Sequence, residues 1–145
     1  VKGDPGMAVR FGNCCNPLPG DPIIGLLREG HGLRIHTHAC KAVRKSRSIE
    51  SNNWLHVDWE PDPGRLFDVL IRVMIRNVRG ALGRVATGIS QAGANIVQVT
   101  MDGNNHGLTS DLYFIIQVSD RQHLARLMRH LRHVPDVIRI AREQE

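Results

Sequence analysis

Apolar and polar residues alternate most regularly in the second half of the chain. Over Leu70–Arg76 every second side chain is apolar, which predicts a strand with one buried face. From about Gly80 to Gln91 the apolar residues are instead three and four positions apart, as on one face of a helix. Gly93 is a suitable end for that helix, because glycine readily adopts the backbone conformation that follows a helix. The pattern therefore predicts a strand followed directly by a helix.

The rest of the second half completes a recognisable order of elements. The remaining elements expected are strands over Asn95–Asp102 and Ser110–Val118, a hairpin loop over 103–107, a helix from an N-cap at Asp120 to about Leu131, and a last strand over Val137–Ala141. The order β-α-β-β-α-β is that of the ferredoxin-like fold. We therefore expect two helices on one face of a four-stranded antiparallel sheet.

The first half is interrupted by turn residues and has room only for short elements. The sequence Pro-Asp-Pro-Gly at 61–64 ends this region, so we expect two domains, residues 1–64 and 65–145. The elements expected in the first domain are a hairpin of Ile23–Leu27 and Leu33–His36, a short helix from an N-cap at Thr37 to about Ser46, and a strand over Trp54–Trp59.

Composition and charge narrow the class of protein. With 145 residues, 41% apolar and 23% charged, the chain has the composition of a folded globular protein. Only 4% of the residues are aromatic, so the core must be largely aliphatic. A net charge of +5 permits an anionic partner but does not require one. Three cysteines cannot form a complete disulfide framework, which favours the reducing cytoplasm, and no apolar run is long enough to span a membrane.

Three cysteines and a histidine carry the clearest candidate chemistry. The side chains of Cys14, Cys15, His36 and Cys40 suit zinc in number and in softness. If His36 and Cys40 lie on the expected helix, their spacing of four residues directs both toward one point. Adjacent cysteines are less usual ligands than Cys-x-x-Cys pairs. The alternative is two small buried side chains, an unrelated Cys40 and a surface histidine.

The residues around these cysteines resemble a known family. Residues 11–25 (Phe-Gly-Asn-Cys-Cys-Asn-Pro-Leu-Pro-Gly-Asp-Pro-Ile-Ile-Gly), then 30–36 (Gly-His-Gly-Leu-Arg-Ile-His) and Cys40, are similar to the Cys-Cys zinc-finger domain of RelA/SpoT stringent-response enzymes. Those proteins end in an ACT domain with the βαββαβ order, so the resemblance covers nearly the whole chain. It implies the α+β class: a small zinc-finger-like α+β domain followed by a ferredoxin-like ACT domain. The implied zinc ligands are Cys14, Cys15, His36 and Cys40, and His38 is an additional candidate.

The resemblance implies a regulatory region rather than an enzyme. It points to the C-terminal part of a bifunctional (p)ppGpp synthetase/hydrolase, and the sequence does not show whether the parent synthesises ppGpp, hydrolyses it or does both. The chain opens on Val1 and has no His-Asp hydrolase motif, so the catalytic domains are expected in a longer chain. The implied partners are those N-terminal catalytic domains, a second copy of the chain, and ribosomal RNA, tRNA or a regulatory protein. Zinc is the only cofactor expected, with no organic cofactor.

The turn between the first ACT strand and the first ACT helix is the candidate effector site. Backbone N–H groups at a helix N-terminus can hold a carboxylate, and a glycine there lets a ligand approach closely. In amino-acid-sensing ACT domains this loop acts with a strand of a partner subunit, which implies a branched-chain amino acid effector. The implied residues are Asn77, Arg79, Gly80, Ala81 and Leu82, with Asn95 and Ile96 across the interface. Two alternatives are a tight turn that serves packing alone, and an acylphosphatase-like use of the same Asn and Arg.

The second helix of this half is strongly basic. Its candidate RNA contacts are Arg126, Arg129, His130 and His133, and the alternative is a solvated outer face. Base stacking on a sheet needs several aromatic residues, and the open face of the expected sheet offers only Tyr113, beside Met74 and Ile115. That face suits contact with another protein, so we expect a homodimer. The second function hypothesis is an RNA- or ribosome-binding module that acts mainly through charge.

Overall fold

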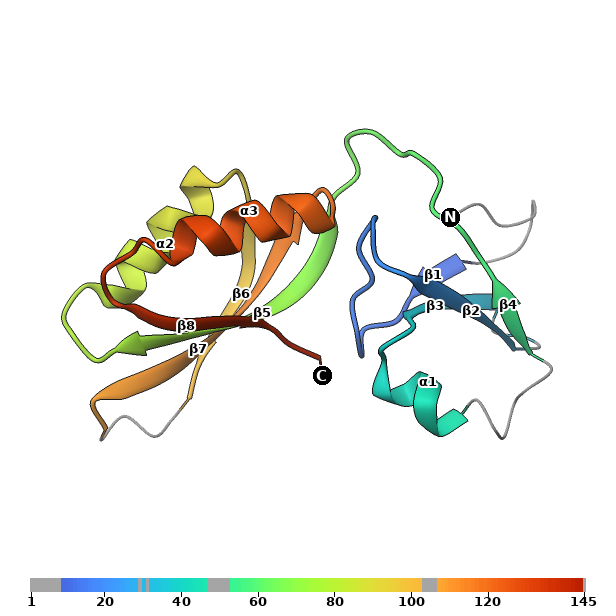
Figure 1. Ribbon diagram of the computed structural model, residues 1–145, viewed down its shortest axis with the longest axis horizontal. Helices are drawn as coiled ribbons and strands as arrows, with labels where there is room; N and C mark the ends of the chain where they lie inside the picture. Colours follow the sequence, from blue (N-terminus) through green and yellow to red (C-terminus); the bar gives the residue numbers. More distant parts are fainter. Residues whose placement is uncertain (1–8, 29, 31, 47–52, 103–106, 145) are drawn as a thin grey trace. The chain divides into compact units, whose positions relative to one another are not determined.

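The computed structural model describes residues 9–28, 30, 32–46, 53–102 and 107–144. The chain divides into two compact units: the first unit is Val1–Arg65 with Gln144–Glu145, and the second unit is Leu66–Glu143. Each unit contains one four-stranded sheet (Figure 1). The expected α+β class is confirmed. Within the described residues, no helix combines the length and the apolar character that a membrane crossing needs.

The first unit is built on a small mixed sheet. Its elements are β1 (Val9–Phe11), β2 (Ile23–Arg28), β3 (Gly32–Thr37), α1 (Lys41–Ser46) and β4 (Trp54–His56). The strand order is β1-β3-β2-β4, and β2 and β3 form the predicted antiparallel hairpin. β1 runs parallel to β3, which the sequence pattern did not indicate. One face of this sheet carries a small core of Cys15, Ile24, Cys40 and Val43, the last contributed by α1.

The predicted helix start in the first unit is wrong. α1 begins at Lys41, and Thr37 is the last residue of β3, paired with Ile23 of β2. The β-branched Thr37 suits a strand, and its pairing in the sheet outweighs its preference for a helix cap. A turn in which the Cys40 N–H donates to the Thr37 carbonyl at 3.1 Å then leads into the helix. His36 and Cys40 therefore do not share a helix face as expected.

The strand predicted over Trp54–Trp59 is shorter than expected and ends at His56. Beyond it the chain leaves the sheet edge and covers the opposite face. The Trp59 indole N–H donates to the Asp21 carbonyl at 2.9 Å, and its ring stacks on Phe11 with the centroids 5.7 Å apart. Packing the large aromatic ring of Trp59 stabilises the fold more than extending an exposed edge strand would.

The second unit has the predicted βαββαβ order. Its elements are β5 (Phe67–Arg76), α2 (Ala81–Gln91), β6 (Asn95–Met101), β7 (Thr109–Val118), α3 (Arg121–Leu131) and β8 (Val137–Arg142). The strands pair antiparallel in the order β6-β7-β5-β8, and both helices lie on one face of the sheet (Figure 1). The Asp120 carboxylate caps α3, as predicted, by accepting the His123 N–H at 2.7 Å. Residues 103–106 of the predicted hairpin loop lie outside the described residues.

The core of the second unit is aliphatic apart from Phe67 and Phe114. The fully buried side chains come from alternate positions of β5 and β7 and from the inner faces of both helices: Val69, Ile71, Val73, Val85, Ile89, Leu112, Phe114, Ile116, Val118, Leu127 and Leu131. Met74, Tyr113 and Ile115 occupy the intervening positions and are half-buried on the other face. The expected open face with one aromatic residue is therefore present.

We expect Gly88→Val to lower the free energy of unfolding of the second unit by about 1–3 kcal/mol, the usual cost of overpacking. Gly88 is buried where α2 meets α3, and a Cβ atom there would lie 2.8 Å from Leu131 Cδ2. The matched control is Gly83→Val in the same helix, because nothing lies within 4 Å of a Cβ at Gly83. Its effect should stay within about 0.5 kcal/mol. Denaturant unfolding of both variants tests the pair, and equal effects would contradict this packing.

Candidate metal centre

The four predicted ligands come from three separate parts of the first unit. Cys14 and Cys15 lie in the turn after β1, His36 lies near the end of β3, and Cys40 directly precedes α1. The turn closes with the Asn16 N–H donating to the Gly12 carbonyl at 2.9 Å. Asn16 has a φ of 47°, a left-handed conformation that asparagine tolerates better than most residues. This reversal allows two adjacent cysteines to contribute to one cluster.

Gly12 is required by the close approach of His36. A Cβ atom at Gly12 would lie 2.9 Å from His36 Nδ1 and 3.2 Å from Cys14 Sγ, and neither atom is free to move away without leaving the cluster. Only glycine leaves that space open. The Phe-Gly-Asn-Cys-Cys sequence thus supplies a close approach, a turn and two ligands in succession.

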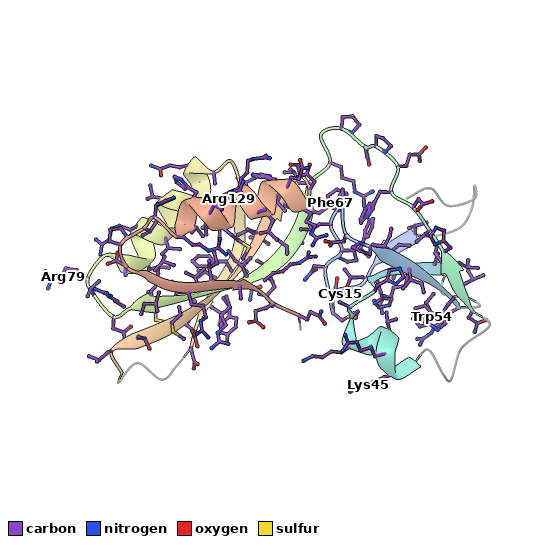
Figure 2. The ribbon with its side chains drawn as sticks, viewed as in Figure 1. Cys15, Lys45, Trp54, Phe67, Arg79 and Arg129 are labelled. Atoms are coloured by element: carbon purple, nitrogen blue, oxygen red, sulfur yellow. The ribbon has the colours of Figure 1, made fainter. Side chains whose placement is uncertain are left out.

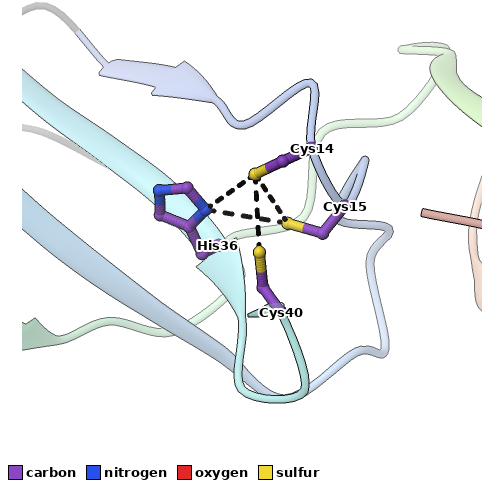
Figure 3. Close-up of side chains that lie close together, drawn as sticks. All are labelled: Cys14, Cys15, His36 and Cys40. Atoms are coloured by element: carbon purple, nitrogen blue, oxygen red, sulfur yellow. Dashed lines mark hydrogen bonds between the residues drawn. The ribbon is translucent and has the colours of Figure 1, made fainter. Parts of the chain in front are cut away.

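The four side chains point toward one centre (Figure 3). Cys14 Sγ lies 3.3 Å from His36 Nδ1, 3.4 Å from Cys40 Sγ and 3.9 Å from Cys15 Sγ. Cys15 Sγ lies 3.8 Å from His36 Nδ1, and all four donor atoms are within 4.8 Å of one another. In a tetrahedral zinc site the metal–ligand bond lengths place neighbouring ligand atoms about 3.5–3.8 Å apart. The donor set and its spacing therefore fit one tetrahedral zinc ion. We call these four residues the Cys/His cluster.

The Cys/His cluster is enclosed by its own small core. Cys15 and Cys40 are 2% and 1% exposed, whereas Cys14 is half-buried. The Thr37 N–H donates to Cys15 Sγ at 3.4 Å, and the Trp54 ring stands edge-on to His36 with the centroids 6.3 Å apart. Four protein ligands leave no open position for a substrate, which is the arrangement of structural rather than catalytic zinc sites.

The surroundings affect the ionisation of each ligand. Burial raises the pKa of Cys15 to about 12, and burial together with the neighbouring Cys40 raises the pKa of Cys14. Burial also opposes ionisation of Cys40, but hydrogen bonds from the Cys14 thiol and the Ala42 N–H outweigh it and lower the Cys40 pKa. Burial lowers the pKa of His36, so its imidazole is neutral, which is the form that binds metals. Loading the site therefore requires a metal that displaces thiol protons.

His38, the additional candidate ligand, lies outside the cluster. It is exposed, whereas the grouping that could hold a metal contains only the other four predicted residues. The strand ends at Thr37, so His38 lies in the following turn and does not continue the alternation that would place it on the same face as His36. The structure therefore brings together the four residues predicted as ligands and separates the fifth.

Hydrogen bonds of Asn77 hold the candidate effector loop against residues 107–110. The Asn77 amide donates to the Gly107 carbonyl at 2.7 Å and to the Thr109 carbonyl at 3.2 Å, and its oxygen accepts the Ser110 hydroxyl. Both amide N–H groups are thus engaged, and Figure 2 shows the labelled Arg79 pointing outward. This arrangement does not support the acylphosphatase-like alternative. Gly80 has a φ of 82°, so a side chain at this position would strain the backbone.

Asn95 and Ile96 do not join this loop within one chain. β6 is an edge strand, and Asn95 pairs with Gln117 of β7, which in turn pairs with Asp68 near the start of β5. Asn77 follows the other end of β5. A site that combines this loop with β6 would therefore require a second copy of the chain.

Two of the four basic residues predicted to contact RNA, His130 and His133, line a groove that the sequence analysis missed. Arg126 and Arg129 are exposed, and His130 Nε2 lies 3.1 Å from Gln91 Oε1 of α2. A groove of about 560 Å³ runs between the two helices, lined by Gly80, Gly83, Arg84, Thr87, Gln91, His130, His133, Val134 and Pro135. The small residues of α2 recur at helical spacing, and this spacing is the sequence signal that could have predicted the groove.

Comparison with known families and proteins agrees with this geometry. Residues 1–60 match the RelA/SpoT RIS domain and residues 63–142 match an ACT domain. The bifunctional (p)ppGpp synthase/hydrolase SpoT of Escherichia coli K12 is 33% identical over 144 residues, which are 99% of this chain and 20% of that protein. A GTP pyrophosphokinase of Myxococcus xanthus is 30% identical over 142 residues, which are 98% of this chain and 18% of that protein. The chain thus spans about a fifth of the length of these relatives.

The second unit also resembles a solved structure. The ACT domain of a GTP pyrophosphokinase from Chlorobium tepidum is 23% identical, with a TM-score of 0.47, and the match covers 54% of this chain and 99% of that one. The two family matches between them account for residues 1–60 and 63–142, and neither describes a catalytic domain. Together with the match to SpoT over 99% of this chain, they identify the chain as the RIS and ACT regulatory region of a member of the RelA/SpoT family.

Proposed function

We propose that this chain is a zinc-stabilised regulatory region that controls (p)ppGpp synthesis or hydrolysis by catalytic domains of a longer cytoplasmic protein. The observation that carries the proposal is the Cys/His cluster, in which four donor atoms lie within 4.8 Å of one another. Its closed arrangement suits a structural ion that holds the first unit in shape. Zinc is the only cofactor we propose, with no organic cofactor. The names of the relatives support ppGpp metabolism as the process that is controlled.

Regulation requires that the region change the activity of the catalytic domains. In the longer protein, Cys15→Ala should change the ratio of ppGpp synthesis to hydrolysis by a factor on the order of 5 or more, the usual size of such coupling. The reason is that Cys15 is buried in the cluster, so its loss disorganises the first unit. Leu55→Ala, at an exposed position of β4, is the control and should leave the ratio unchanged. Equal ratios for all three proteins would overturn the regulatory role.

The second unit is the proposed sensor. A branched-chain amino acid would place its carboxylate at the N-terminus of α2, where Gly80 provides no side-chain cap and Leu82 is exposed beside it. Asn95 and Ile96 would come from a second copy, because the register separates them from this loop within one chain. The sensor therefore requires a homodimer, with the apolar side chains of the exposed strand β6 at the interface.

Calorimetry with valine, isoleucine and leucine tests the sensor. Leu82→Ala should weaken binding by about 1–3 kcal/mol, the usual contribution of a hydrophobic contact in a pocket. Leu55→Ala is a matched control, since Leu55 and Leu82 are each 39% exposed and Leu55 lies in the other unit. Sedimentation should show a dimer under the same conditions. Absence of binding heat at millimolar amino acid would leave Gly80 as a packing residue and exclude this effector.

The second candidate function is RNA or ribosome binding by α3. The exposed Arg126 and Arg129 favour it, with His130 and His133 beside them. Figure 2 shows the labelled Arg129 on α3. Binding through phosphate contacts should weaken steeply as salt rises, whereas amino acid binding should depend little on salt. RNA titrations at two salt concentrations therefore distinguish a charge-driven RNA contact from the proposed sensor.

A further inference from the structure

Three arginines lie on one face of the first sheet, beside the Cys/His cluster. Arg10 of β1 pairs directly with Arg34 of β3, and Arg34 pairs with Leu26 of β2. Arg28 is two residues beyond Leu26, so it projects from the same face. Because paired residues on neighbouring strands also share a face, the three guanidinium groups are brought to one side of the sheet by its register.

These arginines border a cleft of about 430 Å³, which we call the arginine cleft. The lining residues are Arg10, Cys14, Leu26, Arg28, Gly32, Arg34, His36 and Ala42. All the charged side chains in this set are positive, and the remaining wall is small or apolar. Gly32 stands opposite Arg28 in the register, where the lack of a side chain opens the cleft. The volume falls in the range of about 300–1,000 Å³ that small-molecule sites occupy.

The positive charges of Arg10 and Arg34 are not balanced by carboxylates of the described residues. Within the part of the chain that the structure describes, Arg10 and Arg34 make no ion pair or hydrogen bond through their side chains. Arg34 and His36 are two residues apart on β3 and project from the same face, so the positive charge lies directly beside the cluster. Zinc bound by three thiolates and an imidazole would carry a single negative charge. That charge offsets only one of the two positive charges of Arg10 and Arg34.

We propose that the arginine cleft binds a nucleoside di- or triphosphate. Guanidinium groups bind phosphate oxygens in a bidentate manner, and two or more phosphates suit a cleft that three arginines line. The apolar wall formed by Leu26 and Ala42, together with the open position at Gly32, accommodates the uncharged part of the ligand. This site lies in the first unit, separate from the effector loop of the second unit, and does not depend on the function proposed above.

Binding of GTP and ATP to the 145-residue chain tests this inference, with amide and arginine NMR signals as the readout. GTP, GDP and ATP should shift the signals of Arg10, Arg28 and Arg34. Inorganic pyrophosphate should bind more weakly than GTP, and guanosine without phosphates should not bind. Arg34→Gln and Arg10→Gln should each reduce the affinity by about tenfold or more, because each removes a charge-assisted hydrogen bond.

The matched control is Arg129→Gln, which removes the same charge from an exposed position in the second unit and should leave the affinity unchanged. Nucleotide should also slow removal of zinc by a chelator, because Cys14 and His36 line the cleft and the two binding events are linked. An absence of shifts in the three arginines at millimolar GTP would overturn the proposal. So would an affinity that Arg129→Gln lowers as much as Arg34→Gln. Binding of a single-stranded RNA oligonucleotide without binding of GTP or pyrophosphate would show an RNA surface instead and would also overturn it.

Discussion

Removal of zinc from the chain should unfold the first unit and leave the second unit folded. The ligands come from a turn, a strand end and the residue before a helix, so the ion joins segments that otherwise meet in a small core around Ile24 and Val43 on this face of the sheet. Structural zinc contributes apparent binding free energies on the order of 10 kcal/mol, which in a small unit is folding free energy. Amide exchange with and without a chelator measures the protection of each unit separately.

Two histidines two residues apart provide the control for this experiment. His36→Ala removes a ligand and should abolish amide protection in β2 and β3 even when zinc is present. His38→Ala removes an exposed imidazole outside the cluster and should have no effect. A chelated chain whose first unit is as protected as the untreated one would contradict the structural role of the metal. Equal effects of the two histidine variants would contradict the ligand set.

Phe114→Ala should destabilise the second unit by about 3–5 kcal/mol, the usual cost of truncating a buried aromatic side chain. Phe114 is fully buried in β7 and is the largest of the fully buried side chains of the described chain. Its removal leaves a cavity in the aliphatic core beside Ile71, its partner on β5. Zinc content and the protection of the first unit should be unchanged, because the two units are separately compact.

Tyr113→Ala is the matched control for the core. Tyr113 is the next residue of the same strand, but it faces the opposite side of the sheet and is only half-buried. Its truncation should cost clearly less than that of Phe114. Denaturant unfolding followed by signals from each unit measures both variants. The same loss for both would contradict the assignment of the inner face, and loss of zinc from Phe114→Ala would contradict the independence of the units.

The second unit could be predicted almost completely from the sequence because its elements are long and regular. β5 and β7 each have ten residues, and their alternation places the same face inward over the whole strand. The cap of α3 at Asp120 is also a local signal. Only the ends differ, as for β5, which begins at Phe67 rather than Leu70. Local pattern and global fold agree throughout this half.

The first unit was less predictable because its elements are short and depend on distant partners. Thr37 suits both a helix cap and a strand, and only its pairing with Ile23 decides between them. The four residues of the Cys/His cluster were nevertheless predicted together, because their type and number and the family resemblance do not depend on the expected helix. The prediction that His36 and Cys40 share a helix was wrong, yet both side chains belong to the cluster.

The groove between α2 and α3 and the arginine cleft depend on contacts between segments far apart in the sequence. Arg10 and Arg34 become neighbours only because β1 runs parallel to β3, and no local pattern indicated that pairing. Sequence periodicity defines which face of an element is buried, but the register decides which exposed side chains meet. This is why the charged face of the first unit was not predicted.

Native mass spectrometry of the purified chain tests the central claim most directly, because it counts the metal ions held by each folded molecule. The account predicts one zinc ion per chain for the unaltered protein and for His38→Ala, and none for His36→Ala. The mass of the zinc-bound form should also show the loss of thiol protons, since thiolates are the ligands. A chain that is folded in both units and carries no zinc after purification in zinc-containing buffer would contradict the claim.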